Sequence, residues 1–133
     1  MTVYLDTNIV IYFVEQNPAW RAKVIARLAR FRAVKDQMAV GDLTRAECLV
    51  GPFRSGDATI EASYRVFFAD PEIRVLPMTA TICEQAARIR AAEKFELVDA
   101  LHLATAVEHG CGLFLTNDSH LARCTVIPVE VLA

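Results

Sequence analysis

The chain has 133 residues, of which 54% are hydrophobic and 8% aromatic, and its formal net charge is -2. This length suits a single domain with its own core, and the composition excludes a disordered chain. No stretch approaches the roughly 18 uninterrupted apolar residues of a membrane helix, and Asp6 stands where a signal peptide would carry basic residues. We therefore expect a soluble, cytoplasmic protein with one domain over residues 1–133, which does not coat nucleic acid by charge alone.

Short extended apolar runs alternate with longer helical segments along the chain. In chain order we predict a strand at Val3–Leu5, helices over Asn8–Val14 and from Pro18 to about Val34, a strand at Met38–Val40, helices over Thr44–Val50 and Ala58–Ala69, a strand at Arg74–Leu76, helices over Ala80–Lys94 and Ala100–Val107, a strand at Leu113–Leu115 and a last strand near Val126–Ile127. This alternation is typical of the α/β class. With right-handed crossovers it predicts a three-layer α/β/α sandwich around a mainly parallel, twisted sheet.

Residues with special backbone preferences mark several boundaries between these segments. Asn17 is a suitable cap and Pro18 a suitable first-turn residue for the second helix. The stretch from Gly51 to Gly56 contains two glycines and a proline, which predicts a loop. Asp70-Pro71 ends the helix that precedes it, because the residue before a proline disfavours the helical conformation.

Four carboxylates stand where predicted elements begin or end. Asp6 directly follows the first strand, and Asp118 comes shortly after the strand at Leu113–Leu115. Asp99 stands at the start of a helix, and Glu47 lies in the predicted first turn of another. In a parallel α/β sheet the carboxyl ends of the strands and the helix N-termini open on one crevice, so these side chains should converge.

Gathered carboxylates need a counter-charge. Two of them about 5 Å apart repel by roughly 3 kcal/mol at an effective dielectric constant near 20, so a cluster would take up protons or bind a cation. Hard divalent ions favour oxygen ligands, and Mg²⁺ keeps several waters while it takes one or two carboxylates directly. Such a site suits hydrolysis of a phosphodiester, since the ion activates water and stabilises charge on the phosphate.

Each of these acids also has a purely structural explanation. Thr44 and Glu47 match the S/T-x-x-E capping box, and Asp99 would be favourable at a helix N-terminus without any ligand. Asp6 and Asp118 could each form a turn or cap a helix. His102 is one turn from Asp99, but the histidines show no metal-binding spacing.

A basic segment lies between Arg21 and Lys35, where six cationic residues occur without one acid. Lys23, Arg27 and Arg30 recur at the spacing of one helical face and could hold phosphates. A solvated helix face is the alternative explanation. No dinucleotide, P-loop or serine-hydrolase motif is present.

Four ordered motifs together resemble the PIN domain, and in size and order the chain is similar to VapC-type toxins of bacterial toxin-antitoxin pairs. The motifs are Leu5-Asp6-Thr7-Asn8, Leu43 to Glu47, Val98 to Ala106 and Leu115-Thr116-Asn117-Asp118. The resemblance implies a metal-dependent endoribonuclease that forms a homodimer and is inhibited by a small antitoxin protein covering the site. It also implies that Asp6, Glu47, Asp99 and Asp118 are catalytic and hold Mg²⁺ or Mn²⁺, with Thr7, Asn8, Thr116 and Asn117 orienting them.

The reaction expected from this resemblance is in-line attack of a metal-activated water on RNA, which leaves 5′-phosphate and 3′-hydroxyl ends. The expected RNA-binding residues are Lys23, Arg27, Arg30 and Arg45. Asp42 departs from the pattern, because relatives commonly have a small hydroxyl residue there, and it is a possible fifth acid. A DNA-directed PIN-like nuclease and a non-catalytic PIN-like interaction module are the alternatives. The RNA target, the antitoxin, and the type and number of ions are not readable from the sequence.

Overall fold

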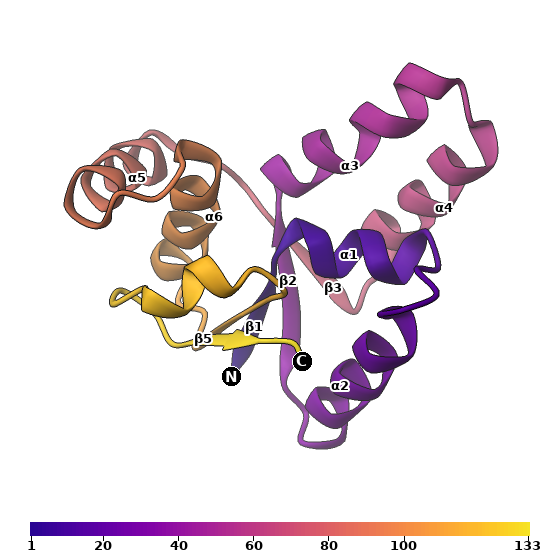
Figure 1. Ribbon diagram of the computed structural model, residues 1–133, viewed down its shortest axis with the longest axis horizontal. Helices are drawn as coiled ribbons and strands as arrows, with labels where there is room; N and C mark the ends of the chain where they lie inside the picture. The colour runs from indigo at the N-terminus through magenta and orange to yellow at the C-terminus, as the bar shows by residue number, and fades with distance from the viewer.

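The computed structural model describes residues 1–133 and contains a five-stranded sheet with the strand order β3-β2-β1-β4-β5 (Figure 1). The strands are β1 (Thr2–Leu5), β2 (Gln37–Gly41), β3 (Ile73–Leu76), β4 (Leu113–Thr116) and β5 (Val129–Val131). Every neighbouring pair is parallel. The predicted fold class is confirmed, and the sheet is parallel throughout.

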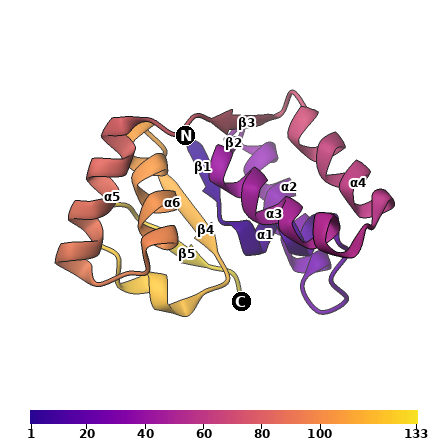
Figure 2. The ribbon, with the colours of Figure 1, turned by 90° about the horizontal axis from the view of Figure 1, so that it is seen from above.

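Helices cover both faces of the sheet, as the view from above shows (Figure 2). One face carries α1 (Thr7–Val14), α2 (Arg21–Ala33), α3 (Asp42–Ser55) and α4 (Ala58–Ala69). The other carries α5 (Ala80–Glu93), α6 (Leu97–Glu108) and the short 3-10 helix η1 (Ser119–Arg123). None of these helices has the length and apolar character needed to span a membrane.

The central strand β1 is buried on both faces, which explains its unbroken apolar sequence. Val3 and Leu5 pack into the core under α1 to α4, while Tyr4 between them packs into the core under α5 and α6. This period of two follows from the pleat of a strand. Asp6 therefore stands at the end of the central, buried strand, where α1 begins.

The second helix begins later than predicted. Asn17 does act as a cap, but its Oδ1 accepts the backbone N–H groups of Ala19 at 2.9 Å and Trp20 at 3.0 Å, which forms a separate turn over residues 18–20. The α-helix starts at Arg21. A side chain that satisfies local amides in this way competes with the helix itself.

The predicted loop at Gly51–Gly56 is wrong, because α3 runs from Asp42 through Gly51 and Pro52 to Ser55. A proline inside a helix costs about 3 kcal/mol, so packing outweighs this local preference: Pro52 is buried and α3 packs against α4. Gly56 ends the helix in the left-handed conformation with φ 71°, and its N–H bonds to the Pro52 carbonyl. Because the helix also begins two residues earlier than predicted, Glu47 lies in its second turn.

The last strand is displaced from the predicted position near Val126–Ile127 to Val129–Val131. Ile127 is instead buried in the core beneath α5 and α6. Pro128 has no N–H to donate, but its carbonyl accepts the N–H of Phe114 at 3.0 Å and starts the pairing with β4.

Candidate metal centre

Asp6 and Asp118 are joined through the hydroxyl group of Thr116. Asp6 is buried as the N-cap of α1, and its carboxylate accepts the Thr7 N–H at 2.9 Å and the Thr116 hydroxyl at 2.7 Å. The same hydroxyl oxygen accepts the N–H of Asp118 at 3.0 Å. The ends of β1 and β4 are thus fixed to each other by one buried threonine, which sets the relative position of two carboxylates.

The two asparagines of the motifs have different tasks. Asn8 approaches the Asp6 carboxylate with Nδ2 at 3.4 Å, and its Oδ1 accepts the N–H of Asn117 at 3.2 Å. The Asn117 side chain accepts the Tyr12 hydroxyl at 2.9 Å and donates to the Leu132 carbonyl at 3.0 Å. Asn8 therefore supports a carboxylate directly, whereas Asn117 connects the turn after β4 to α1 and to the chain end.

Glu47 is held by side chains from α1 and α6. Its Oε1 accepts the Thr7 hydroxyl at 2.6 Å and lies 2.5 Å from Nε2 of the buried His102. On the other side of the ring, Nδ1 lies 2.6 Å from the Tyr4 hydroxyl. An ionised carboxylate only accepts, so Nε2–H of His102 donates to Glu47. The sequence shows that His102 is close to Asp99, but it did not predict the role of Tyr4. This tyrosine lies in an apolar strand, where its residue type is typical of the core.

The capping-box explanation of Glu47 is wrong. Gly41 precedes α3, and its N–H donates to the hydroxyl of Thr44, the third residue of the helix, at 3.0 Å. Thr44 itself thus supplies the side-chain cap. Glu47 lies three residues further on and its carboxylate faces Thr7 and His102 instead.

Asp99 is the third residue of α6 and is half-buried. Burial, followed by repulsion from Asp6 and Asp118, raises its pKa to about 6. Burial also raises the pKa of Asp6, although His102 and the hydrogen bonds oppose this. For Glu47, burial alone would raise the pKa, but hydrogen bonds from His102 and Thr7 outweigh it and lower the pKa. The carboxylates are therefore close enough to perturb one another.

This donor set fits a hydrated divalent cation. No three of the protein's His, Cys, Asp or Glu side chains are arranged to enclose an ion by themselves. All four groups offer hard oxygen atoms, the ligand type that suits Mg²⁺ or Mn²⁺, and these ions take only a few direct carboxylate ligands and keep waters for the rest. Asp42 is exposed at the start of α3 and is not hydrogen-bonded to the cluster.

The structure places the predicted RNA contacts on two helices, with Lys23, Arg27 and Arg30 on α2 and Arg45 on α3. Arg27 already forms a two-pronged ion pair with Glu130 at 2.6 and 2.7 Å. The Arg45 guanidinium lies 4.7 Å from the centre of the Phe68 ring, toward α4. None of the four is hydrogen-bonded to the acidic cluster.

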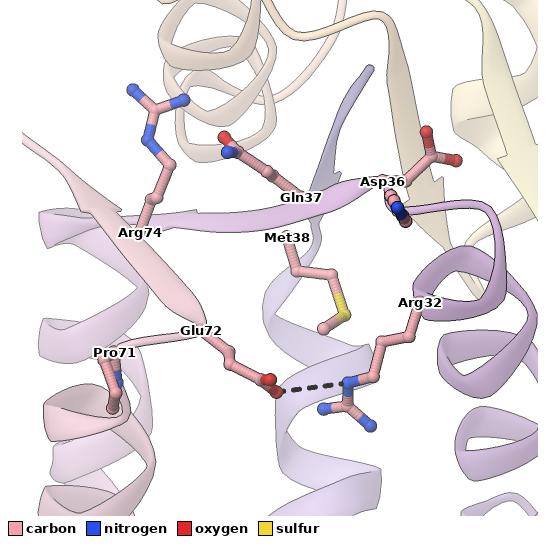
Figure 3. A pocket seen from close by; sticks show the side chains of 8 residues that line it. Arg32, Asp36, Gln37, Met38, Pro71, Glu72 and Arg74 are labelled. Atoms are coloured by element: carbon pink, nitrogen blue, oxygen red, sulfur yellow. Dashed lines mark ion pairs between the residues drawn. The ribbon is translucent and has the colours of Figure 1, made fainter.

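Two pockets lie at opposite ends of the sheet. One of about 310 Å³ lies where β2 and β3 begin, and Arg32 faces Glu72 across it with Nε and Oε2 3.5 Å apart (Figure 3). None of the four carboxylates lines it. Another of about 320 Å³ lies at the carboxyl end of the sheet and is lined by Asp99 and Asp118.

This fold and this arrangement of acids at the strand ends define the class of protein. The PIN domain model matches residues 3–126, and the chain belongs to the PIN domain family. No curated protein sequence matches this chain.

Solved structures that are similar to this chain include toxin-antitoxin proteins. VapBC2 from Rickettsia felis, bound to a DNA fragment from its promoter, has a TM-score of 0.83 at 17% identity over 100% of both chains. VapBC-1 from nontypeable Haemophilus influenzae has a TM-score of 0.74 at 22% identity, over 99% of this chain and 98% of that one. Mycobacterium tuberculosis VapC20, a sarcin-ricin loop cleaving toxin, has a TM-score of 0.63 at 20% identity, over 84% and 86%. At these identities the likeness concerns the fold.

Proposed function

We propose that this protein is a metal-dependent endoribonuclease and the toxin of a toxin-antitoxin pair. The observation that carries the proposal is the gathering of four carboxylates from four different elements at the carboxyl end of a parallel sheet, where, besides burial, Asp6, Asp118 and Glu47 all raise the pKa of Asp99. Membership of the PIN domain family and the fold shared with VapBC proteins support it. That VapC20 is an RNA-loop-cleaving toxin favours RNA as the substrate class.

In this proposal the residues Asp6, Glu47, Asp99 and Asp118 hold Mg²⁺ or Mn²⁺. When bound, such an ion lowers the pKa of a water and stabilises charge on the attacked phosphate. The Thr116 hydroxyl fixes the Asp6 carboxylate, and Thr7 fixes Glu47, so that neither must reorganise as the substrate enters. A water that attacks the phosphorus atom in line with the leaving 3′ oxygen would leave a 5′-phosphate and a 3′-hydroxyl.

The protonation states of the acids follow from their surroundings. Hydrogen bonds from His102 and Thr7 keep Glu47 ionised, whereas Asp99, whose pKa is about 6, gives up its proton readily when a cation binds. We further propose a homodimer, a small antitoxin protein that covers the acidic cluster, and contacts from Lys23, Arg27, Arg30 and Arg45 to the RNA backbone. Arg27 would have to exchange Glu130 for a phosphate to take part.

Cleavage of mixed cellular RNA by the purified protein tests this function. We expect discrete fragments with 5′-phosphate ends in the presence of Mg²⁺ or Mn²⁺ and none with excess chelator. A parallel digest of single-stranded DNA separates RNA from DNA specificity. Intact RNA under every condition, from a folded protein free of any partner, would argue for a non-catalytic binding module.

Replacing Thr116 by valine should weaken metal binding by about 10- to 100-fold, the usual effect of losing a group that orients a ligand. The substitution removes the hydroxyl that donates to Asp6 at 2.7 Å and accepts from Asp118 at 3.0 Å, while the shape of the side chain is kept. Calorimetric titration with Mn²⁺ measures the effect.

Thr105→Val is the matched control for this measurement. Thr105 is equally buried, but its hydroxyl donates to the Leu101 carbonyl within α6 at 2.7 Å. We expect its Mn²⁺ affinity to equal that of the wild type. Equal affinities for Thr116→Val and Thr105→Val would remove Thr116 from the metal centre.

A further inference from the structure

The pocket of about 320 Å³ beside the acidic cluster has a mixed lining. Asp99 and Asp118 belong to the cluster, while Lys94, His120 and Arg123 bring nitrogen-bearing side chains to the same hollow. They come from the connection between α5 and α6 and from η1, which lie side by side (Figure 2). Two of the four acids are thus in a common hollow with cationic groups.

Arg123 is oriented by contacts that do not neutralise its positive charge. Its guanidinium donates to the backbone carbonyls of Glu93 and, at 3.4 Å, Lys94, and lies 4.1 Å from the centre of the Phe95 ring. It forms no ion pair with any carboxylate. A guanidinium oriented by carbonyls and an aromatic face keeps its full positive charge and its remaining N–H groups for an anion.

Lys94 and His120 complete this side of the pocket. Lys94 is exposed and forms no ion pair, and Glu96, which also lines the pocket, has Oε2 4.0 Å from Nη1 of Arg90. His120 is also exposed, with Nδ1 3.7 Å from Asp118 Oδ1, so its ring stands at the border between the cations and the acids. This differs from α2, where Glu130 already neutralises Arg27.

A polyanionic substrate needs positive charge at this place. Four ionised carboxylates with one divalent ion still leave about two negative charges, which repel a phosphate. The charges of Lys94 and Arg123 offset this excess. They also lie on the side of the cluster to which Asp99 and Asp118 point, since these two acids line the same pocket.

We propose that Lys94, His120 and Arg123 form a phosphate-binding subsite that holds the RNA backbone next to the bond that is cut. This inference rests on the proposed ribonuclease function and adds to it the path of the strand, which crosses the connection between α5 and α6 beside the cluster. Lys94 supplies a mobile point charge, and Arg123 supplies guanidinium N–H groups in a fixed orientation.

Substitution of Lys94 by asparagine tests the subsite without disturbing the fold. Lys94 has φ 60° at the end of α5, a left-handed conformation that asparagine adopts more readily than lysine. Lys35 is a matched control: it is exposed, has φ 63°, forms no ion pair and lines the pocket at the opposite end of the sheet. Lys35→Asn therefore makes the same change in charge and backbone preference far from the acids.

The measurement is the affinity for a labelled, mixed-sequence single-stranded RNA oligonucleotide at several salt concentrations, with chelator present so that no cleavage occurs. For Lys94→Asn we expect affinity lower by up to about five-fold, the size of one exposed ion pair, and a salt slope smaller by about 0.7. Lys35→Asn should match the wild type in both. Thermal melting of all three proteins checks that the variants are folded.

Equal affinity and slope for the two variants would overturn the subsite, as would a wild-type protein that does not bind the oligonucleotide. Because binding is measured without metal, this result is independent of cleavage. A protein that cleaves RNA but shows no difference between the variants loses only the subsite. A protein that shows the difference but never cleaves loses only the nuclease function.

Discussion

Asp6→Asn should reduce RNA cleavage by about a thousand-fold or more and leave the protein folded. In the proposed mechanism Asp6 helps to hold the cation, and the charge stabilisation that the cation supplies amounts to several kcal/mol, with each 1.36 kcal/mol giving a factor of ten in rate. The fold should survive because asparagine caps a helix as well as aspartate, so its Oδ1 can still accept the Thr7 N–H. Burial already raises the pKa of Asp6, so a neutral side chain is easily accommodated there.

Asp42→Asn is the matched control for Asp6→Asn. Asp42 also stands at the end of a strand and the start of a helix, but it is exposed and is not hydrogen-bonded to the cluster. We expect this variant to cleave at the wild-type rate, which would exclude a fifth catalytic acid. Initial rates on one RNA substrate at fixed Mn²⁺, with melting curves for both variants, supply the comparison. A purified Asp6→Asn protein with undiminished activity would contradict the assignment of the site.

The architecture could be predicted because short apolar runs are visible in the sequence and indicate which strands are buried in the sheet. Val3-Tyr4-Leu5 is apolar at every position, which indicates a strand buried on both faces, and it is the central strand. The continuation of α3 through Gly51 and Pro52 was not predictable. Local preferences at those residues oppose the helix, and only packing against α4, which the sequence does not display, favours it.

The candidate site shows the same division between local and tertiary information. Asp6 and Asp118 could be found because an acid after an apolar run is visible in the sequence. The contact between Tyr4, His102 and Glu47 could not, because it joins residues 98 and 55 positions apart. The spacing of Asp99 and His102, one helical turn, indicated only that His102 lies near one of the four acids.

Asp99→Asn should stabilise the metal-free protein while it abolishes metal binding. The pKa of Asp99 is raised from 3.8 to about 6, so the folded state holds this proton more tightly than the unfolded state. Stability from this group is therefore greatest below about pH 4 and is lost as the pH rises to about 6. At neutral pH the ionised group destabilises the metal-free fold by about 1 kcal/mol, after discounting for its partial exposure, and asparagine removes that effect.

Melting curves with and without Mn²⁺ at pH 5 and pH 7.5 show which of the two proteins, the wild type or Asp99→Asn, is more stable under each condition. Without metal, Asp99→Asn should melt about 4 °C above the wild type at pH 7.5, with a smaller difference at pH 5. At a Mn²⁺ concentration 100 times the wild-type Kd, the wild type gains about 2.7 kcal/mol and should become the more stable protein. Asp57→Asn is the control, because Asp57 is the cap of α4 and asparagine caps a helix equally well. Its melting temperature should equal that of the wild type at both pH values, with and without Mn²⁺. If Mn²⁺ stabilised Asp99→Asn as much as the wild type, Asp99 would be a helix-terminal acid that does not bind the cation.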